Sequence, residues 1–207
     1  MIKKEKFREW VEQQRWTEIK DKAEQQFAIA REVWLLPLIA IANAHLGLQQ
    51  LARDALSRAE ANLDKLDHAA KVDLAGVYLL ANVPNKASKL LEEAVQALPS
   101  YGLALARLAM CRHMQGDIVS ARVLLRSAVT AEPARITAWV PHLRHVINDL
   151  ARAEGAEKMD MLTAALTGLQ KAQQQLLVQK NELPSDVAFR WQNQLDAIQL
   201  ELWVRQG

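Results

Sequence analysis

The chain has 207 residues, half of them hydrophobic, with only seven glycines and six prolines, so it can bury a sizeable core and does not have the composition of a disordered chain. Its 26 lysine and arginine residues nearly balance 24 aspartate and glutamate residues, which leaves a net charge of +2. No segment gathers enough basic residues to follow a phosphate backbone, so we predict that nucleic acid is not a partner.

Apolar residues recur three and four positions apart in every segment, and no segment alternates with the period of two that strands require. We therefore predict an all-α fold with helices of about 12 to 16 residues in the first two thirds. The expected breaks between helices lie at 14–15, 47, 66–67, 82–85, 99–100, 116–117, 133, 155 and 184–185.

The N-terminal residues 1–32 form the first predicted unit, with Trp10 in one helix and Trp16 near the next. This unit rests mainly on amphipathic spacing, and a capping helix pair is an alternative. In the second unit, 33–67, the apolar run 33–46 is interrupted by Pro37 and is too short to span a membrane. The charged N-terminus does not fit a signal peptide either, so we predict a cytoplasmic protein without a membrane span.

The units 68–101 and 102–135 repeat each other with a period of 34 residues. The matching pairs are Leu74 and Leu108, Ala75 and Ala109, Ala87 and Ala121, Leu90 and Leu124, Leu91 and Leu125, Ala94 and Ala128, Val95 and Val129, and Pro99 and Pro133. A fixed period of this length is typical of helical solenoids, in which each helix pair buries its apolar face against the next.

These residues, in this order, resemble the tetratricopeptide repeat (TPR) family, whose 34-residue unit has a small residue in each helix and a late proline. The resemblance is clearest over 68–135. The unit 33–67 keeps the pattern with a one-residue slip, at Ile39, Ala40, Ala52, Leu56 and Ala59. What the resemblance implies is a right-handed α-α superhelix of about 10–11 antiparallel helices, formed by 1–207 as a single solenoid.

The last part of the chain, 136–207, diverges from the repeat, and we expect one helix of about 25 residues over 157–181. Residues 199–207 look like the close of a repeat's first helix, and Leu200, Trp203 and Val204 are not the polar residues of a solenoid cap. We therefore expect the chain to be the N-terminal part of a longer protein. The alternative is that a final helix from Ser185 is itself the cap.

Motifs for nucleotide binding, esterase-type hydrolysis and thiolate zinc sites are missing from the sequence, so we predict no catalytic residue and no cofactor. His142, His145 and Asp149 on one helix, with His113 one repeat earlier, are the nearest approach to a metal site. Surface or groove histidines explain them better, and no metal is predicted. Cys111 is expected to be a packed core thiol, because its neighbours are apolar.

Family geometry implies that the inner faces of successive first helices line a concave groove. The predicted partner-binding residues are Trp34, Leu38, Ile41, His45, Val72, Asp73, Leu80, Leu103, Arg107, Met110, His113, Met114, Val140, Arg144 and Asn148, with Gly76 on the same face. The set is mostly apolar. Only Arg107, Arg144 and Asn148 could serve in the clamp with which some TPR domains hold C-terminal carboxylates, so we do not predict such a clamp.

The leading prediction is thus a non-enzymatic scaffold that binds an apolar or amphipathic peptide or helix of a partner protein in the groove. The groove could instead be filled by the chain's own C-terminal part or by a second copy in a homodimer. A different class of function is a helical regulatory or oligomerisation module of a larger enzyme, such as the bacterial sulfotransferases or glycosyltransferases that carry such repeats. RNA binding by helical repeats is disfavoured, because the inner face lacks polar, base-reading side chains.

Overall fold

The computed structural model describes residues 1–132 and 136–206, and in this part of the chain it contains α-helices, one short 3₁₀ helix and no strand. The prediction of an all-α fold is confirmed. The helices are α1 (Lys4–Glu12), α2 (Trp16–Ala30), α3 (Leu35–His45), α4 (Gln49–Glu60), η1 (Leu63–Lys65), α5 (His68–Leu80), α6 (Pro84–Ala97), α7 (Gly102–Met114), α8 (Ile118–Ala131), α9 (Ile136–Leu150), α10 (Gly155–Gln179) and α11 (Ser185–Gln206).

Most helix breaks lie where the sequence predicts them. Gly47 and Gly116 end α3 and α7 in the left-handed conformation, with φ of 75° and 84°, which glycine adopts without steric cost. Pro84 occupies the first turn of α6, where its missing N–H breaks no hydrogen bond. The break predicted at Pro133 and the end of the chain at Gly207 lie outside the described residues.

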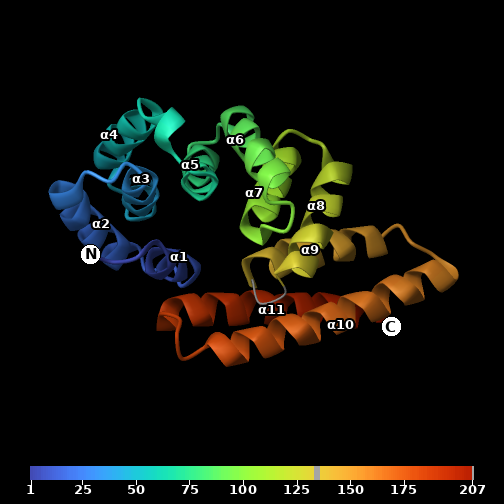
Figure 1. Ribbon diagram of the computed structural model, residues 1–207. Coiled ribbons are helices and arrows are strands. Elements are labelled where there is room, and N and C mark those ends of the chain that lie inside the picture. The colour runs from blue at the N-terminus through green and yellow to red at the C-terminus, as the bar shows by residue number, and fades with distance from the viewer. Residues whose placement is uncertain (133–135, 207) are drawn as a thin grey trace.

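The repeated positions occupy equivalent places in the packing. Ala75 and Ala109, in the first helices α5 and α7, are buried, and so are Ala87 and Ala121 in the second helices α6 and α8. Within each pair α3/α4, α5/α6 and α7/α8 the two helices contact each other, and α3, α5, α7 and α9 contact one another in succession. The helices follow one another around an arc from α2 to α9 (Figure 1). Small side chains at these positions let the backbones of paired helices approach closely.

The C-terminal helices depart from this arrangement. The helix predicted over 157–181 is confirmed as α10, and it forms a long hairpin with α11 that packs against α9. Leu195, Ile198 and Leu202 of α11 are fully buried in this contact. The hairpin runs back along the open side of the arc towards the N-terminal helices (Figure 1).

At the N-terminus, α1 is anchored by aromatic packing. The Phe7 side chain is fully buried, and its ring meets the Trp10 and Trp34 rings edge to face at centroid distances of 5.4 and 5.7 Å. Lys4 lies over the Trp34 ring, 5.1 Å from its centroid. This cluster fixes the position of α1 beside α3 and thereby closes one end of the arc. None of the described helices is long and apolar enough to cross a membrane.

Candidate functional site

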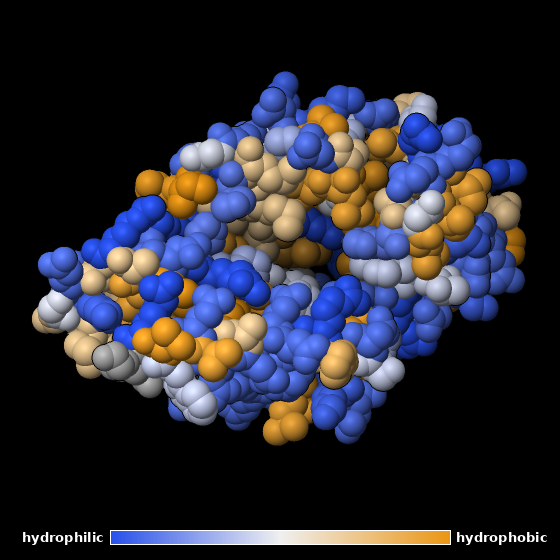
Figure 2. Space-filling model, turned by 180° about the vertical axis from the view of Figure 1, so that it is seen from behind, coloured by the Kyte–Doolittle hydropathy of each residue, from blue (hydrophilic) through white to orange (hydrophobic). Residues whose placement is uncertain are grey.

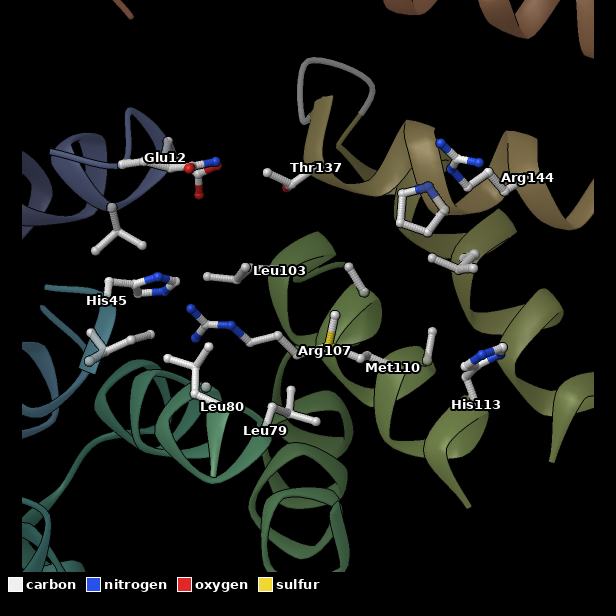
Figure 3. A pocket seen from close by; sticks show the side chains of 18 of the residues that line it. Glu12, His45, Leu79, Leu80, Leu103, Arg107, Met110, His113, Thr137 and Arg144 are labelled. Atoms are coloured by element: carbon white, nitrogen blue, oxygen red, sulfur yellow. The ribbon is translucent and has the colours of Figure 1, made fainter. Parts of the chain in front are cut away.

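A groove of about 560 Å³ lies on the inner side of the arc. Its walls come from α1, the turn that follows it, Trp16 at the start of α2, and the helices α3, α5, α7 and α9, with Leu125 contributed by α8. Seen from behind, the molecule is hollowed near its centre (Figure 2). In close-up, side chains from helices far apart in the sequence point into one space (Figure 3). The volume falls within the range of ordinary small-molecule pockets, about 300–1,000 Å³.

The floor of the groove is apolar. Leu80 of α5 and Met110 of α7 are 50% and 52% exposed, and Leu79, Leu103 and Ala106 line the groove with them. On α7 the lining residues recur every three or four positions, so the helix turns one continuous face towards the groove. Large apolar side chains that stay half-exposed on a concave surface indicate a binding site.

A nearly buried ion pair joins Arg107, which lines the groove, to Asp73, which does not. Arg107 Nη1 donates a hydrogen bond of 2.6 Å to the Val72 carbonyl oxygen and lies 3.2 Å from Asp73 Oδ1, with both charged side chains nearly buried. Gly76 makes room for the arginine, because a Cβ at that position would lie 2.9 Å from Arg107 Cζ. Burial raises the pKa of Asp73, and the neighbouring guanidinium offsets part of that rise. The charge of Arg107 is therefore already balanced within the protein.

His45 forms one end of the groove. Its imidazole stacks on the Trp16 indole, with ring centroids 4.0 Å apart and an angle of 5° between the planes. Desolvation lowers the pKa of His45 to about 4, and the positive charges of Arg107 and Arg190 contribute to the shift. The His45 imidazole is thus uncharged at neutral pH.

The opposite end carries polar and basic groups. The His113 and His145 rings meet edge to face at a centroid distance of 5.3 Å, and desolvation together with the charge of His113 lowers the pKa of His145. Arg144 and Asn148 of α9 are exposed at this end. Within the described part of the chain, neither residue has a side-chain hydrogen bond or an ion pair.

Nine of the fifteen predicted partner-binding residues line the groove. They are Ile41, His45, Leu80, Leu103, Arg107, Met110, His113, Arg144 and Asn148, and Gly76 lies with them.

The other six predicted residues lie elsewhere. Leu38, Val72 and Val140 are at most 4% exposed and belong to the core, while Asp73 is buried in its pair with Arg107. Trp34 packs on Phe7, and Met114 lies beyond the groove lining. For Leu38 the reason is that α3 is packed on several sides, so Leu35–Asn43 are all buried. These six residues are not part of the candidate surface.

Sequence reasoning missed the contribution of the N-terminal segment and of the start of α9. Val11, Glu12, Gln14 and Trp16 line the groove, and so does Thr137 across from them. Glu12 and Thr137 point towards each other over the groove (Figure 3). The weak repeat pattern in 1–32 could have indicated this contribution. If 1–32 is a repeat unit, its first helix lies on the same inner surface as the first helices of the later units.

The remaining reactive side chains do not assemble into a second site. Cys111 is a buried core thiol, as predicted, and desolvation raises its pKa to about 11, so it is protonated at neutral pH. Among the described residues there is no group of three or more histidine, cysteine, aspartate or glutamate side chains that could hold a metal ion. Asp149, the nearest carboxylate to His145 on α9, forms an ion pair with Arg122.

A separate apolar surface lies on α11. Leu200, Trp203 and Val204 are 61%, 60% and 75% exposed, and their spacing of three and four places them on one face of the helix. Leu195, Ile198 and Leu202 face the core instead. This exposed stripe lies outside the groove, whose described lining residues all precede α10.

Comparison with protein-family models and with curated proteins finds no match to this chain. The interpretation of the groove therefore depends on its own chemistry.

The stacked pair at the end of the groove gives a first testable prediction. In an NMR titration we expect the His45 imidazole to titrate near pH 4, and to titrate closer to the usual value of about 6.5 in Trp16→Ala, because loss of the indole lets water reach the ring. Since the pKa is lower in the folded chain than in the unfolded chain, unfolding takes up a proton in this window. The stability that His45 contributes should fall as the pH drops from about 6.5 to about 4.

The matched control is Trp203→Ala, which removes an exposed tryptophan outside the groove. It should leave the His45 titration unchanged. A midpoint near 6.5 in the unmodified protein would contradict the stacked arrangement.

Proposed function

We propose that the chain is a TPR-like solenoid, a right-handed α-α superhelix, and that it works as a non-enzymatic scaffold which binds an apolar or amphipathic segment of a partner protein in its groove. Two features support the solenoid: the equal burial of residues 34 positions apart, and the serial contacts of α3, α5, α7 and α9. Groove binding is the usual work of such repeats, because each first helix adds a strip to one continuous inner surface.

The observation that carries the proposal is the half-exposed pair Leu80 and Met110. These two side chains come from successive first helices and lie on the floor of a concave, mostly apolar surface. Burying them under a partner removes their remaining apolar area from water, at about 25 cal/mol per Å². Methionine also adapts its shape to different apolar partners, which suits a surface that receives a side chain from another molecule.

The groove is open to a partner in the described structure. The hairpin of α10 and α11 crosses the open side of the arc, yet the residues that line the groove all precede α10. Filling by this hairpin is therefore not the arrangement we propose. A second copy of the chain remains a competing occupant, and sedimentation velocity over a hundredfold range of protein concentration distinguishes it from a foreign partner.

The experiment that tests the proposed function is a selection of random 12-residue peptides displayed on phage against the full chain. We expect enriched peptides with several large apolar residues. Their binding should be lost when Leu80 and Met110 are both replaced with glutamate. Peptides that bind the doubly substituted chain equally well would place the binding surface elsewhere and contradict the proposal.

A further inference from the structure

The size of the groove limits what it can hold. An α-helix is about 10 Å wide with its side chains and rises 1.5 Å per residue, so about 560 Å³ corresponds to roughly 7 Å of helix. This is about one turn, or four to five residues.

The apolar floor of the groove determines which side chains the bound helical turn should carry. Leu80 from α5 and Met110 from α7 line the groove together with Leu103 and Ala106, and these side chains form an apolar surface on which large side chains of a partner can pack. On a helical turn, two side chains on the same face are three or four residues apart. The segment should therefore carry apolar residues at that spacing.

The charges of the groove are not balanced at its α9 end. Arg107 is neutralised by Asp73, whereas Arg144 has no ion pair within the described residues. His113 and His145 lie at the same end. Glu12, the acidic residue of the lining, is on the opposite side of the groove and has an interaction of its own (Figure 3). An apolar floor beside one unpaired guanidinium is complementary to an apolar segment with one carboxylate.

We propose that the segment bound in the groove is a single helical turn whose apolar side chains pack on Leu80 and Met110, and which carries one internal aspartate or glutamate that pairs with Arg144. This inference rests on the proposed function and adds the charge of the partner to it. The carboxylate is a side chain three or four residues from an apolar anchor. The Arg144 guanidinium accommodates one such group.

The test repeats the peptide selection on two variants at the same low ionic strength. Arg144→Glu reverses the charge in the groove, and Arg53→Glu, at an exposed arginine of α4 outside the groove, is the matched control. We expect the unmodified chain and Arg53→Glu to enrich peptides with an acidic residue three or four positions from a large apolar one. Arg144→Glu should enrich lysine or arginine at that position.

The test is completed by measuring the affinities of two synthetic peptides that differ only at the acidic residue. The best acidic peptide should bind the unmodified chain at least about tenfold more tightly than its Glu→Gln or Asp→Asn version, since hydrogen bonds to charged groups are the stronger ones. The difference should disappear in Arg144→Gln. Circular dichroism should confirm that each variant is as helical as the unmodified chain.

The outcomes separate the two proposals. Apolar peptides without an acidic preference, or the same preference in Arg144→Glu, would overturn this inference and leave the proposed function intact. A selection that enriches no apolar peptide on any of the three chains would contradict both.

Discussion

Replacing Arg107 with methionine is expected to lower the free energy of unfolding by about 3–5 kcal/mol, because it leaves a buried carboxylate without its counter-charge. The Asp73 side chain is only 11% exposed, and the salt-bridge partner that the structure gives it is Arg107. Methionine keeps much of the aliphatic stem, so the loss reports on the charge more than on packing. Urea unfolding, followed by circular dichroism, measures it.

The double variant Asp73→Asn with Arg107→Met should recover most of this loss, because it buries no net charge. The loss in the single variant should also shrink as the pH falls towards the unfolded pKa of aspartate, about 3.9, since Asp73 is then protonated in both states. As a matched control, Lys71→Met removes one partner of the exposed pair Lys71 and Glu93 and should cost less than about 1 kcal/mol. Equal losses at Arg107 and Lys71 would contradict the buried pair.

Replacing both Leu80 and Met110 with glutamate is expected to weaken the binding of a selected apolar peptide by at least about 100-fold, or about 3 kcal/mol. Each substitution removes an apolar contact and introduces a carboxylate that has to leave water when the peptide binds. Both side chains are half-exposed in the free chain, so the folded state should be little affected. Isothermal titration calorimetry measures the change in Kd.

The control for this double variant is Leu98→Glu with Val123→Glu. Leu98 and Val123 are 49% and 61% exposed and lie outside the groove, so they add the same two charges to a similar background. Binding to the control should remain within about threefold of that to the unmodified chain. A comparable loss in both double variants would mean that net charge, and not the groove, determines binding.

The sequence predicts most of this fold because local signals and the repeat agree. Gly47 and Gly116 mark turns that need positive φ, and the 34-residue period identifies the buried positions of α5 to α8. The turn at Arg31 lacked such a mark, because there a non-glycine residue adopts the left-handed conformation at φ of 55°. This turn joins α2 to α3, which pack against each other, and a tertiary contact of this kind is not encoded by a local pattern.

The candidate site was less predictable, because inner-face spacing does not say which residues neighbouring helices cover. Leu38 and Val140 have the right spacing but are buried, whereas Trp16 faces the groove only because α1 and α2 fold onto its end. The ion pair between Asp73 and Arg107, in contrast, could be predicted from the sequence. The two residues are 34 positions apart, so the repeat places them side by side on successive first helices. Opposite charges at equivalent positions indicate an internal ion pair.

Binding in the groove is tested most directly by NMR of the methionine methyl groups. The chain has five methionines, and Met110 lies on the groove floor, whereas Met159 is exposed on α10 away from it. When a selected apolar peptide is titrated into the chain labelled with ¹³C at its methionine methyl groups, the Met110 signal should shift and saturate with the Kd from calorimetry. The Met159 signal should stay unchanged. Saturable binding with an unmoved Met110 signal would contradict the account.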